Sequence, residues 1–290
     1  MTRRMLALLA IAMIAGALTA AGQDATFSVA AEEVRIDVLV TENGKPIAGL
    51  TAADFEVFDT GVPQEIRYAT LQKHTPVSAT LVFDMSRSVA GPLLDHLKEA
   101  ARTFLSDLKK EDQAALITFN NAVALGSSPT RDIARVKSAL NLVQPFGNSS
   151  LIDGSYAGLV LAQSSPNPPL LIIFSDGRDT FSWLTGEAVL GTAKRNGAVV
   201  YAVSTAHLPE KAFLRDLSRL TGGSLFEIES VDDLGTVFLG ILDEFRQRYL
   251  ITYTPRGVPE NGWHKLDVRV KNNPAKVSAR PGYLRSSSDK

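Results

Sequence analysis

Apolar and polar residues alternate in the first part of the chain that carries a clear pattern. Between residues 27 and 71 the segments "VRIDVLV" and "FEVFDTGVPQEIRYATL" alternate, and Asn43, Gly44 and Pro46 lie between them. A period of two places the apolar side chains on one face of an extended strand, and Asn, Gly and Pro are typical of turns. The pattern therefore predicts a small β unit of three or four strands.

The pattern changes between residues 77 and about 246. The runs "ATLVF", "AALITF", "PLLIIFSD" and "AVVYAVST" are short and continuously apolar, as in strands that are buried on both faces. Between them, stretches such as "PLLDHLKEAARTFLSDLKK" repeat apolar residues at helical spacing, with Pro92 in the first turn. Alternating strands and helices predict an α/β fold, a doubly wound and mostly parallel sheet flanked by helices.

Strand-like alternation returns from residue 249, in "YLITYTP" and "WHKLDVRVKN". Because β segments flank the α/β region on both sides, we expect them to form one β unit into which the α/β domain is inserted. Two separate β extensions are the alternative. The expected boundaries are an N-terminal β segment at 24–75, the α/β domain at 76–246, a C-terminal β segment at 247–286 and a polar tail at 287–290.

The first 22 residues have the layout of a secretory signal peptide. Arg3 and Arg4 precede an apolar stretch, which ends in small residues. We expect cleavage after Ala20 or Gly22, and hence a periplasmic or extracellular protein with no membrane span after cleavage. An uncleaved membrane anchor is the alternative, because the apolar part nearly reaches the roughly 20 residues that a span needs.

Composition excludes several classes of protein. The 290 residues contain no cysteine and carry a formal net charge of -1. Disulfides, cysteine-based zinc sites, a cysteine nucleophile and a lipoprotein anchor are therefore excluded. The near-neutral charge and the lack of a long basic run argue against nucleic acid as a partner.

Polar residues follow the predicted strands at the points where those strands end. Asp84, Ser86 and Ser88 follow the first α/β strand, and Asp176 ends a later one. Ligands of doubly wound sheets bind at the carboxyl ends of the strands, and residues at i, i+2 and i+4 of an extended segment point to one side. A set of oxygen donors without His or Cys suits Mg²⁺, Mn²⁺ or Ca²⁺. The structural alternative is that these residues cap the helix beginning near Pro92.

The segment "DMSRS" resembles the D-x-S-x-S signature of the metal-ion-dependent adhesion site, or MIDAS, of von Willebrand factor type A domains. The resemblance implies that Ser86 and Ser88 coordinate the ion directly. It also implies that Asp84 and Asp176 act through water or as acceptors behind the ligands. The apolar strand that ends in "SDG" is similar to the family as well.

The loop "GNSSLID" resembles the family's G-G-T-x-x-x-D pattern. The resemblance places Ser149 at the threonine position and gives Asp153 the role of supporting the loop; Ser150 is the alternative register. Serine keeps the hydroxyl oxygen but lacks the stiff β-branch of threonine.

Two further residues near the expected site need an interpretation. Arg87 stands where the family usually has glycine, and its positive charge would either repel the ion or attract an anionic ligand. Trp183 follows the "SDG" strand end, and it either contacts a partner or packs the loop.

Both flanks resemble those of secreted von Willebrand A-related proteins common in Acidobacteria, so the resemblance covers nearly all of the mature chain. It implies an exported, non-catalytic adhesion module that binds a carboxylate of a protein partner through Mg²⁺, with Mn²⁺ or Ca²⁺ as alternatives. A structural exported protein with a degenerate metal site is one other interpretation. A haloacid-dehalogenase-like phosphatase with Asp84 as nucleophile is another, although Ser86 occupies the position of its usual second aspartate.

Overall fold

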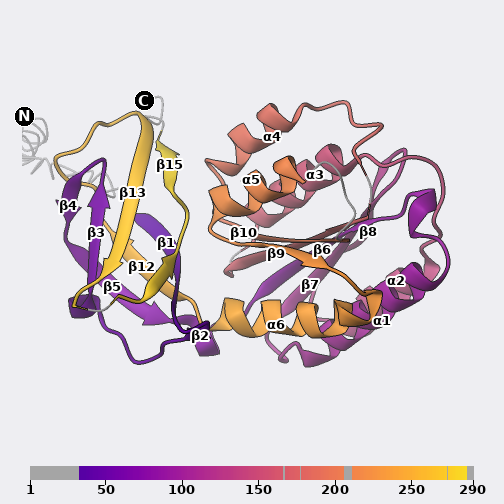
Figure 1. Ribbon diagram of the computed structural model, residues 1–290, viewed down its shortest axis with the longest axis horizontal. Coiled ribbons are helices and arrows are strands. Elements are labelled where there is room, and N and C mark those ends of the chain that lie inside the picture. The colour runs from indigo at the N-terminus through magenta and orange to yellow at the C-terminus, as the bar shows by residue number, and fades with distance from the viewer. Residues whose placement is uncertain (1–32, 166, 177, 206–210, 273, 286–290) are drawn as a thin grey trace, which may run out of the picture. The chain divides into compact units, whose positions relative to one another are not determined.

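The computed structural model describes residues 33–165, 167–176, 178–205, 211–272 and 274–285 (Figure 1). The predicted signal peptide at 1–22 and the polar tail at 287–290 lie outside the described residues. Within the described part, no helix is long and apolar enough to cross a membrane.

A six-stranded sheet forms the centre of the α/β region, in the order β11-β10-β9-β6-β7-β8. All neighbouring strands in it are parallel except β7 and β8, which are antiparallel. The strands are β6 (Ser78–Asp84), β7 (Gln113–Phe119), β8 (Val123–Thr130), β9 (Pro169–Ser175), β10 (Val199–Thr205) and β11 (Leu225–Ile228). The predicted doubly wound, mostly parallel sheet is confirmed.

Helices cover both faces of this sheet, as Figure 1 shows. They are α1 (Pro92–Asp107), α2 (Ile133–Leu142), α3 (Leu151–Gln163), α4 (Gly186–Ala193), α5 (Ala212–Thr221) and α6 (Leu234–Arg246). Alternate residues of β6 serve the two faces: Leu81 and Phe83 belong to the apolar cluster with α1, α2 and α6, and Val82 belongs to the cluster with α3, α4 and α5. A strand buried on both faces must be apolar throughout, which explains the continuous runs in the sequence.

The two flanks build two further antiparallel sheets together. One has the order β14-β1-β12-β5, with β2 also paired to β1, and the other has the order β15-β13-β3-β4. The N-terminal strands are β1 (Val34–Glu42), β2 (Lys45–Pro46), β3 (Phe55–Asp59), β4 (Val62–Gln64) and β5 (Ile66–Leu71). The C-terminal strands are β12 (Tyr249–Tyr253), β13 (Gly262–Val270), β14 (Lys276–Ser278) and β15 (Gly282–Arg285). The fold class predicted for the flanks, a β unit made from both, is therefore confirmed.

The structure adds strands that the sequence patterns did not indicate. The N-terminal flank contains β1 to β5 where three or four strands were expected, because the two-residue β2 and three-residue β4 are too short to show a period. The edge strand β8 is mostly exposed and lacks a sustained apolar pattern. Four short 3₁₀ helices complete the described elements: η1 (Ala52–Asp54), η2 (Gln72–His74), η3 (Arg87–Val89) and η4 (Val231–Asp233).

Candidate functional site

Three loops meet at the carboxyl edge of the central sheet. The first follows β6 and contains η3, the second precedes α3, and the third follows β9. Because β6 and β9 are parallel neighbours, their ends emerge side by side. Polar residues that lie more than 90 positions apart in the sequence, Asp84 and Ser175 for example, thereby come into contact.

Asp84 is the buried centre of this region, with no exposed surface. One of its carboxylate oxygens accepts a hydrogen bond from the backbone N–H of Ser86 at 2.8 Å. The other accepts from the hydroxyls of Ser149 at 2.9 Å and Ser175 at 2.7 Å. A buried charged group needs such partners, and these three bonds tie the loops to the end of β6.

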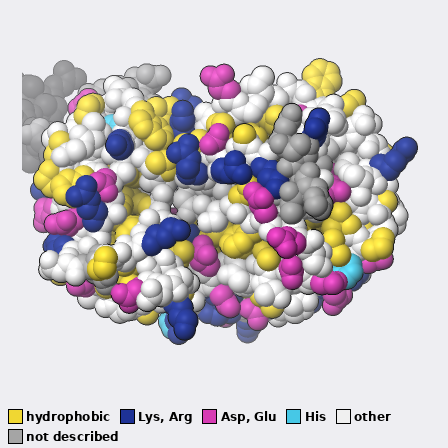
Figure 2. All heavy atoms as spheres, in the orientation of Figure 1, with side chains coloured by type: hydrophobic (Ala, Val, Ile, Leu, Met, Phe, Trp, Pro, Cys, Tyr) yellow, Lys and Arg dark blue, Asp and Glu magenta, His cyan; other side chains and the backbone are white. Residues whose placement is uncertain are grey.

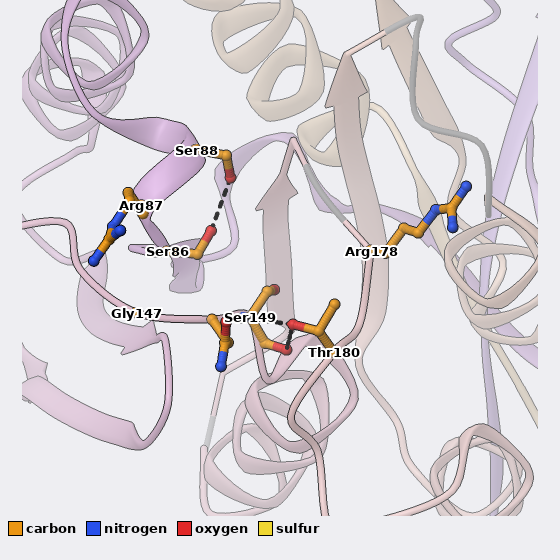
Figure 3. A pocket seen from close by; sticks show the side chains of 8 residues that line it. Ser86, Arg87, Ser88, Gly147, Ser149, Arg178 and Thr180 are labelled. Atoms are coloured by element: carbon orange, nitrogen blue, oxygen red, sulfur yellow. Dashed lines mark hydrogen bonds between the residues drawn. The ribbon is translucent and has the colours of Figure 1, made fainter.

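The two serines of the "DMSRS" segment belong to the same region, where Ser86 is buried and Ser88 is exposed. Their Oγ atoms are 3.1 Å apart, and Figure 3 shows the hydroxyls directed toward one another. The Ser88 hydroxyl also donates to Oδ1 of Asp176 at 3.1 Å. Ser86, Ser88 and Asp176 therefore form one continuous row of oxygen atoms.

The carboxylate of Asp176 lies in a partly buried place near that of Asp84. Burial raises the pKa of the Asp176 carboxyl, and the negative charge of Asp84 raises it further. A divalent cation between the loops would relieve that repulsion. Within the described residues no cluster of three or more His, Cys, Asp or Glu side chains forms a metal site, so a cation bound here would also need the serine hydroxyls. The oxygen donors that are present fit a hard divalent cation.

Ser149 is the loop residue whose hydroxyl contacts Asp84. Its backbone is also held, because the N–H of Thr180 and that of Phe181 donate to its carbonyl oxygen at 2.9 and 3.0 Å. Ser150 is instead the buried N-cap of α3. The loop after β9 is thus folded against the loop before α3 at Ser149.

Asp153 supports the loop after β9 from the first turn of α3. Its two carboxylate oxygens accept hydrogen bonds from the backbone N–H groups of Trp183 and Leu184, each at 2.9 Å. The side chain of Trp183 is nevertheless 90% exposed. The interpretation of Trp183 as a residue that packs the loop is therefore wrong.

The helix-cap interpretation of the "DMSRS" segment is also wrong. The N-cap of α1 is Gly91, with φ of 85° and no side-chain hydrogen bond to the cap. Such a positive φ is readily adopted by glycine. Asp84, Ser86 and Ser88 instead make hydrogen bonds with each other and with the neighbouring loops.

A pocket of about 530 Å³ opens over these loops (Figure 3). Its lining consists of Ser86, Arg87, Ser88, Gly147, Asn148, Ser149, Arg178 and Thr180. The sequence patterns did not indicate Arg178 or Thr180, which follow the "SDG" strand end without a motif of their own. In Figure 3 the side chains of Arg87 and Arg178 lie on opposite sides of the serine hydroxyls and extend away from them.

The fold and these three loops define an α/β domain with an oxygen-lined site at the edge of its sheet. Residues 80–178 match the family model of the von Willebrand factor type A domain. The match begins in β6 and ends in the loop after β9, so it contains Asp84, Ser149 and Asp176. This part of the chain is therefore similar to the von Willebrand factor type A domain, in agreement with the resemblance of "DMSRS".

Two relatives match larger parts of the chain. The inter-alpha-trypsin inhibitor heavy chain H2 of Sus scrofa is 27% identical over 242 residues, covering 73% of this chain and 26% of that protein. A UPF0353 protein of Mycobacterium avium is 23% identical over 224 residues, covering 66% of this chain and 65% of that protein. The chain thus spans about a quarter of the first relative and about two thirds of the second.

Solved structures share the fold. A von Willebrand factor type A protein from Catenulispora acidiphila superposes with a TM-score of 0.54 at 12% identity, covering 86% of this chain and 76% of that chain. Proximal thread matrix protein 1 from the mussel byssus, with zinc in its MIDAS motif, gives a TM-score of 0.54 at 17% identity, covering 63% and 48%. At these identities the similarity shows the fold alone.

Proposed function

We propose that this protein is an exported, non-catalytic module that binds a protein partner through a divalent cation. Ser86 and Ser88 would hold the cation directly, and Ser149, Asp84 and Asp176 would complete and orient the site. The observation that carries the proposal is the row of hydroxyl and carboxylate oxygens that three separate loops bring together.

The kind of ligand atom supports binding rather than catalysis. Hydroxyl groups are neutral, so a cation held largely by them keeps most of its charge and can accept a carboxylate from a partner. Oxygen donors favour Mg²⁺, with Mn²⁺ and Ca²⁺ as alternatives. The zinc in the MIDAS motif of the mussel protein supports a divalent cation in general.

Two other functions have weaker support. The first is a structural protein whose metal site is degenerate, because the positive charge of Arg87 would repel a cation. The side chain of Arg87, however, extends away from the hydroxyls of Ser86 and Ser88 (Figure 3). A phosphatase with Asp84 as nucleophile would need that carboxylate open to substrate, whereas Asp84 is fully buried and accepts three hydrogen bonds. The binding module therefore accounts best for the geometry.

The cation is tested by titrating the purified protein, produced from residue 23 onward, with Mn²⁺ and Mg²⁺ while its thermal unfolding is followed. A ligand at concentration c that binds only the folded state stabilises it by RT ln(1 + c/Kd), so the melting temperature rises with the concentration of the cation. Ser88→Ala should lower the affinity for the cation about tenfold or more. The exposed Ser88 contributes a ligand to the proposed site but little to the stability of the fold.

The matched control is Ser128→Ala, an exposed serine of β8. We expect it to respond to both cations as the unmodified protein does. A protein whose melting temperature ignores Mn²⁺ and Mg²⁺ alike would contradict the proposed function.

Export is proposed from the sequence alone, because residues 1–22 lie outside the described residues. Expression of the full chain in a Gram-negative host, followed by fractionation and mass spectrometry, tests it. We expect a periplasmic product that begins near residue 21 or 23 and has lost the preceding segment.

A further inference from the structure

Two arginines line the pocket over the oxygen row without belonging to the proposed cation ligands. Arg87 comes from the loop after β6 and Arg178 from the loop after β9, and both are exposed. The ion pairs among the described residues involve neither guanidinium. Two unneutralised positive charges therefore stand on opposite sides of one pocket (Figure 3).

We infer that these arginines select an acidic segment of the protein partner that presents at least two carboxylates. One carboxylate would reach the cation at Ser86 and Ser88, and a neighbouring acidic residue of the same segment would pair with Arg87 or Arg178. A guanidinium binds a carboxylate through two parallel N–H donors. The inference rests on the proposed function and specifies the partner of that same site.

Backbone hydrogen bonds hold Arg87 itself and a neighbour of Arg178, which reduces the entropy lost on binding. The N–H of Arg87 donates to the carbonyl oxygen of Gly147 at 3.1 Å. Two residues after Arg178, Thr180 is bonded through its N–H to Ser149. Both guanidinium groups thus extend from anchored loops and need only their side chains ordered by the partner.

The selection is local rather than a property of the whole surface. The chain has a formal net charge of -1, and the face in Figure 2 carries basic and acidic side chains interspersed. Such a surface has no general attraction for acidic chains. A preference for a doubly acidic segment would therefore have to come from the two arginines and the cation.

The experiment measures the binding of two fluorescent ten-residue peptides at saturating Mn²⁺. One carries a single aspartate in a Gly-Ser background, and the other carries three aspartates at alternate positions; both have blocked termini. We expect the triply acidic peptide to bind about tenfold more tightly at 50 mM salt. The gain should shrink severalfold at 500 mM salt, because exposed ion pairs are screened.

Arg87→Gln and Arg178→Gln should each reduce that gain, and the double variant should remove most of it, leaving the part that the cation contributes, while Mn²⁺ binding persists. The matched control is Arg131→Gln, an exposed arginine that follows β8. Because β8 is antiparallel to β7, Arg131 lies at the opposite edge of the sheet, and its variant should keep the full gain.

The outcomes separate the two claims. If the unmodified protein does not bind Mn²⁺, the proposed function fails. If Mn²⁺ binds but the two peptides have equal affinity, or the double variant keeps the full preference, the selection by Arg87 and Arg178 is wrong and the cation site stands.

Discussion

At the scale of single residues, Arg87 is the departure from the family pattern with the clearest physical consequence. Its charge lies near the proposed cation, but its side chain extends away from Ser86 and Ser88 (Figure 3). Solvent and salt weaken the repulsion between the Arg87 guanidinium and the proposed cation. We therefore expect Arg87 to lower the affinity for the proposed cation without preventing binding.

Arg87→Gln should thus tighten Mn²⁺ binding about two- to fivefold at low salt, a range typical of exposed charge interactions. Titration followed by electron paramagnetic resonance measures the free Mn²⁺ directly. Arg131→Gln should leave the affinity unchanged. A variant that binds Mn²⁺ more weakly than the unmodified protein would show that Arg87 supports the site.

Residue patterns indicated the polar groups at the strand ends because the D-x-S-x-S spacing is local. Asp84, Ser86 and Ser88 lie within five residues, but the expected extended backbone ends at Ser86, because Ser88 lies in the 3₁₀ helix η3. Arg178 and Thr180 could not be found in this way. Their places depend on how the loop after β9 folds onto Ser149, which is a tertiary contact with no sequence pattern.

At the scale of elements, the loop after β9 depends on a helix for its conformation. The Asp153 carboxylate at the start of α3 accepts the N–H groups of Trp183 and Leu184. These bonds hold the backbone from which the exposed indole ring of Trp183 extends. The sequence suggested that Asp153 supports the loop of its own motif, "GNSSLID". Its two partners, Trp183 and Leu184, belong instead to the loop after β9.

Asp153→Ala should loosen this loop, because the backbone donors of Trp183 and Leu184 lose their acceptors. Hydrogen exchange followed by mass spectrometry should show at least tenfold faster exchange in peptides that contain these two residues. Peptides from α6 serve as the internal reference and should be unchanged. Equal protection in the variant would mean that other contacts hold the loop.

A second element-scale contact joins the end of α6 to the turn before β7. Arg246 donates to the carboxylate of Asp112 at 2.7 Å, and both side chains are buried. Asp112 also accepts from the backbone N–H groups of Val77 and Lys109. Removing one partner of a buried pair leaves the other charge without compensation.

Asp112→Ala should therefore lower the free energy of unfolding by about 3–5 kcal/mol. Urea denaturation at neutral pH measures the loss, and the exposed Asp107 provides the matched control as Asp107→Ala. If Asp112→Ala lowers the free energy of unfolding by less than about 1 kcal/mol, the pair contributes no more than an exposed ion pair does.

At the scale of the whole molecule, the apolar patterns predicted the fold class because each region has one dominant period. Continuous runs identified the central strands, and alternation identified the flanks. The pairing between flanks is different, because β1 and β12 are joined from Val34↔Tyr253 to Val38↔Tyr249, more than 200 residues apart. Alternation predicts strands but carries no information about their partners.

A buried polar cluster links strands from both flanks in the β unit. Asp59 of β3 accepts hydrogen bonds from the hydroxyls of Tyr253 and Tyr283, at 2.7 and 2.8 Å, and lies 2.8 Å from Nδ1 of His264. Asp59 has no exposed surface, and His264 is 1% exposed. The cluster joins β3, β12, β13 and β15, so one carboxylate ties the N-terminal flank to three C-terminal strands.

Asp59→Ala removes the acceptor that the hydroxyls of Tyr253 and Tyr283 share, and it leaves the buried hydroxyl of Tyr253 without this partner. A buried polar group that loses its partner costs about 1–3 kcal/mol, so we expect the free energy of unfolding to fall by about that amount, measured by urea denaturation. Asp59→Asn keeps an acceptor of the same size, and its free energy of unfolding should fall by less.

Both variants should keep the Mn²⁺ affinity when it is measured below their melting temperatures, because the oxygen row lies on a different sheet. Loss of Mn²⁺ binding in a folded Asp59→Asn protein would show instead that the β unit and the sheet edge are coupled, and that the flanks help to shape the site.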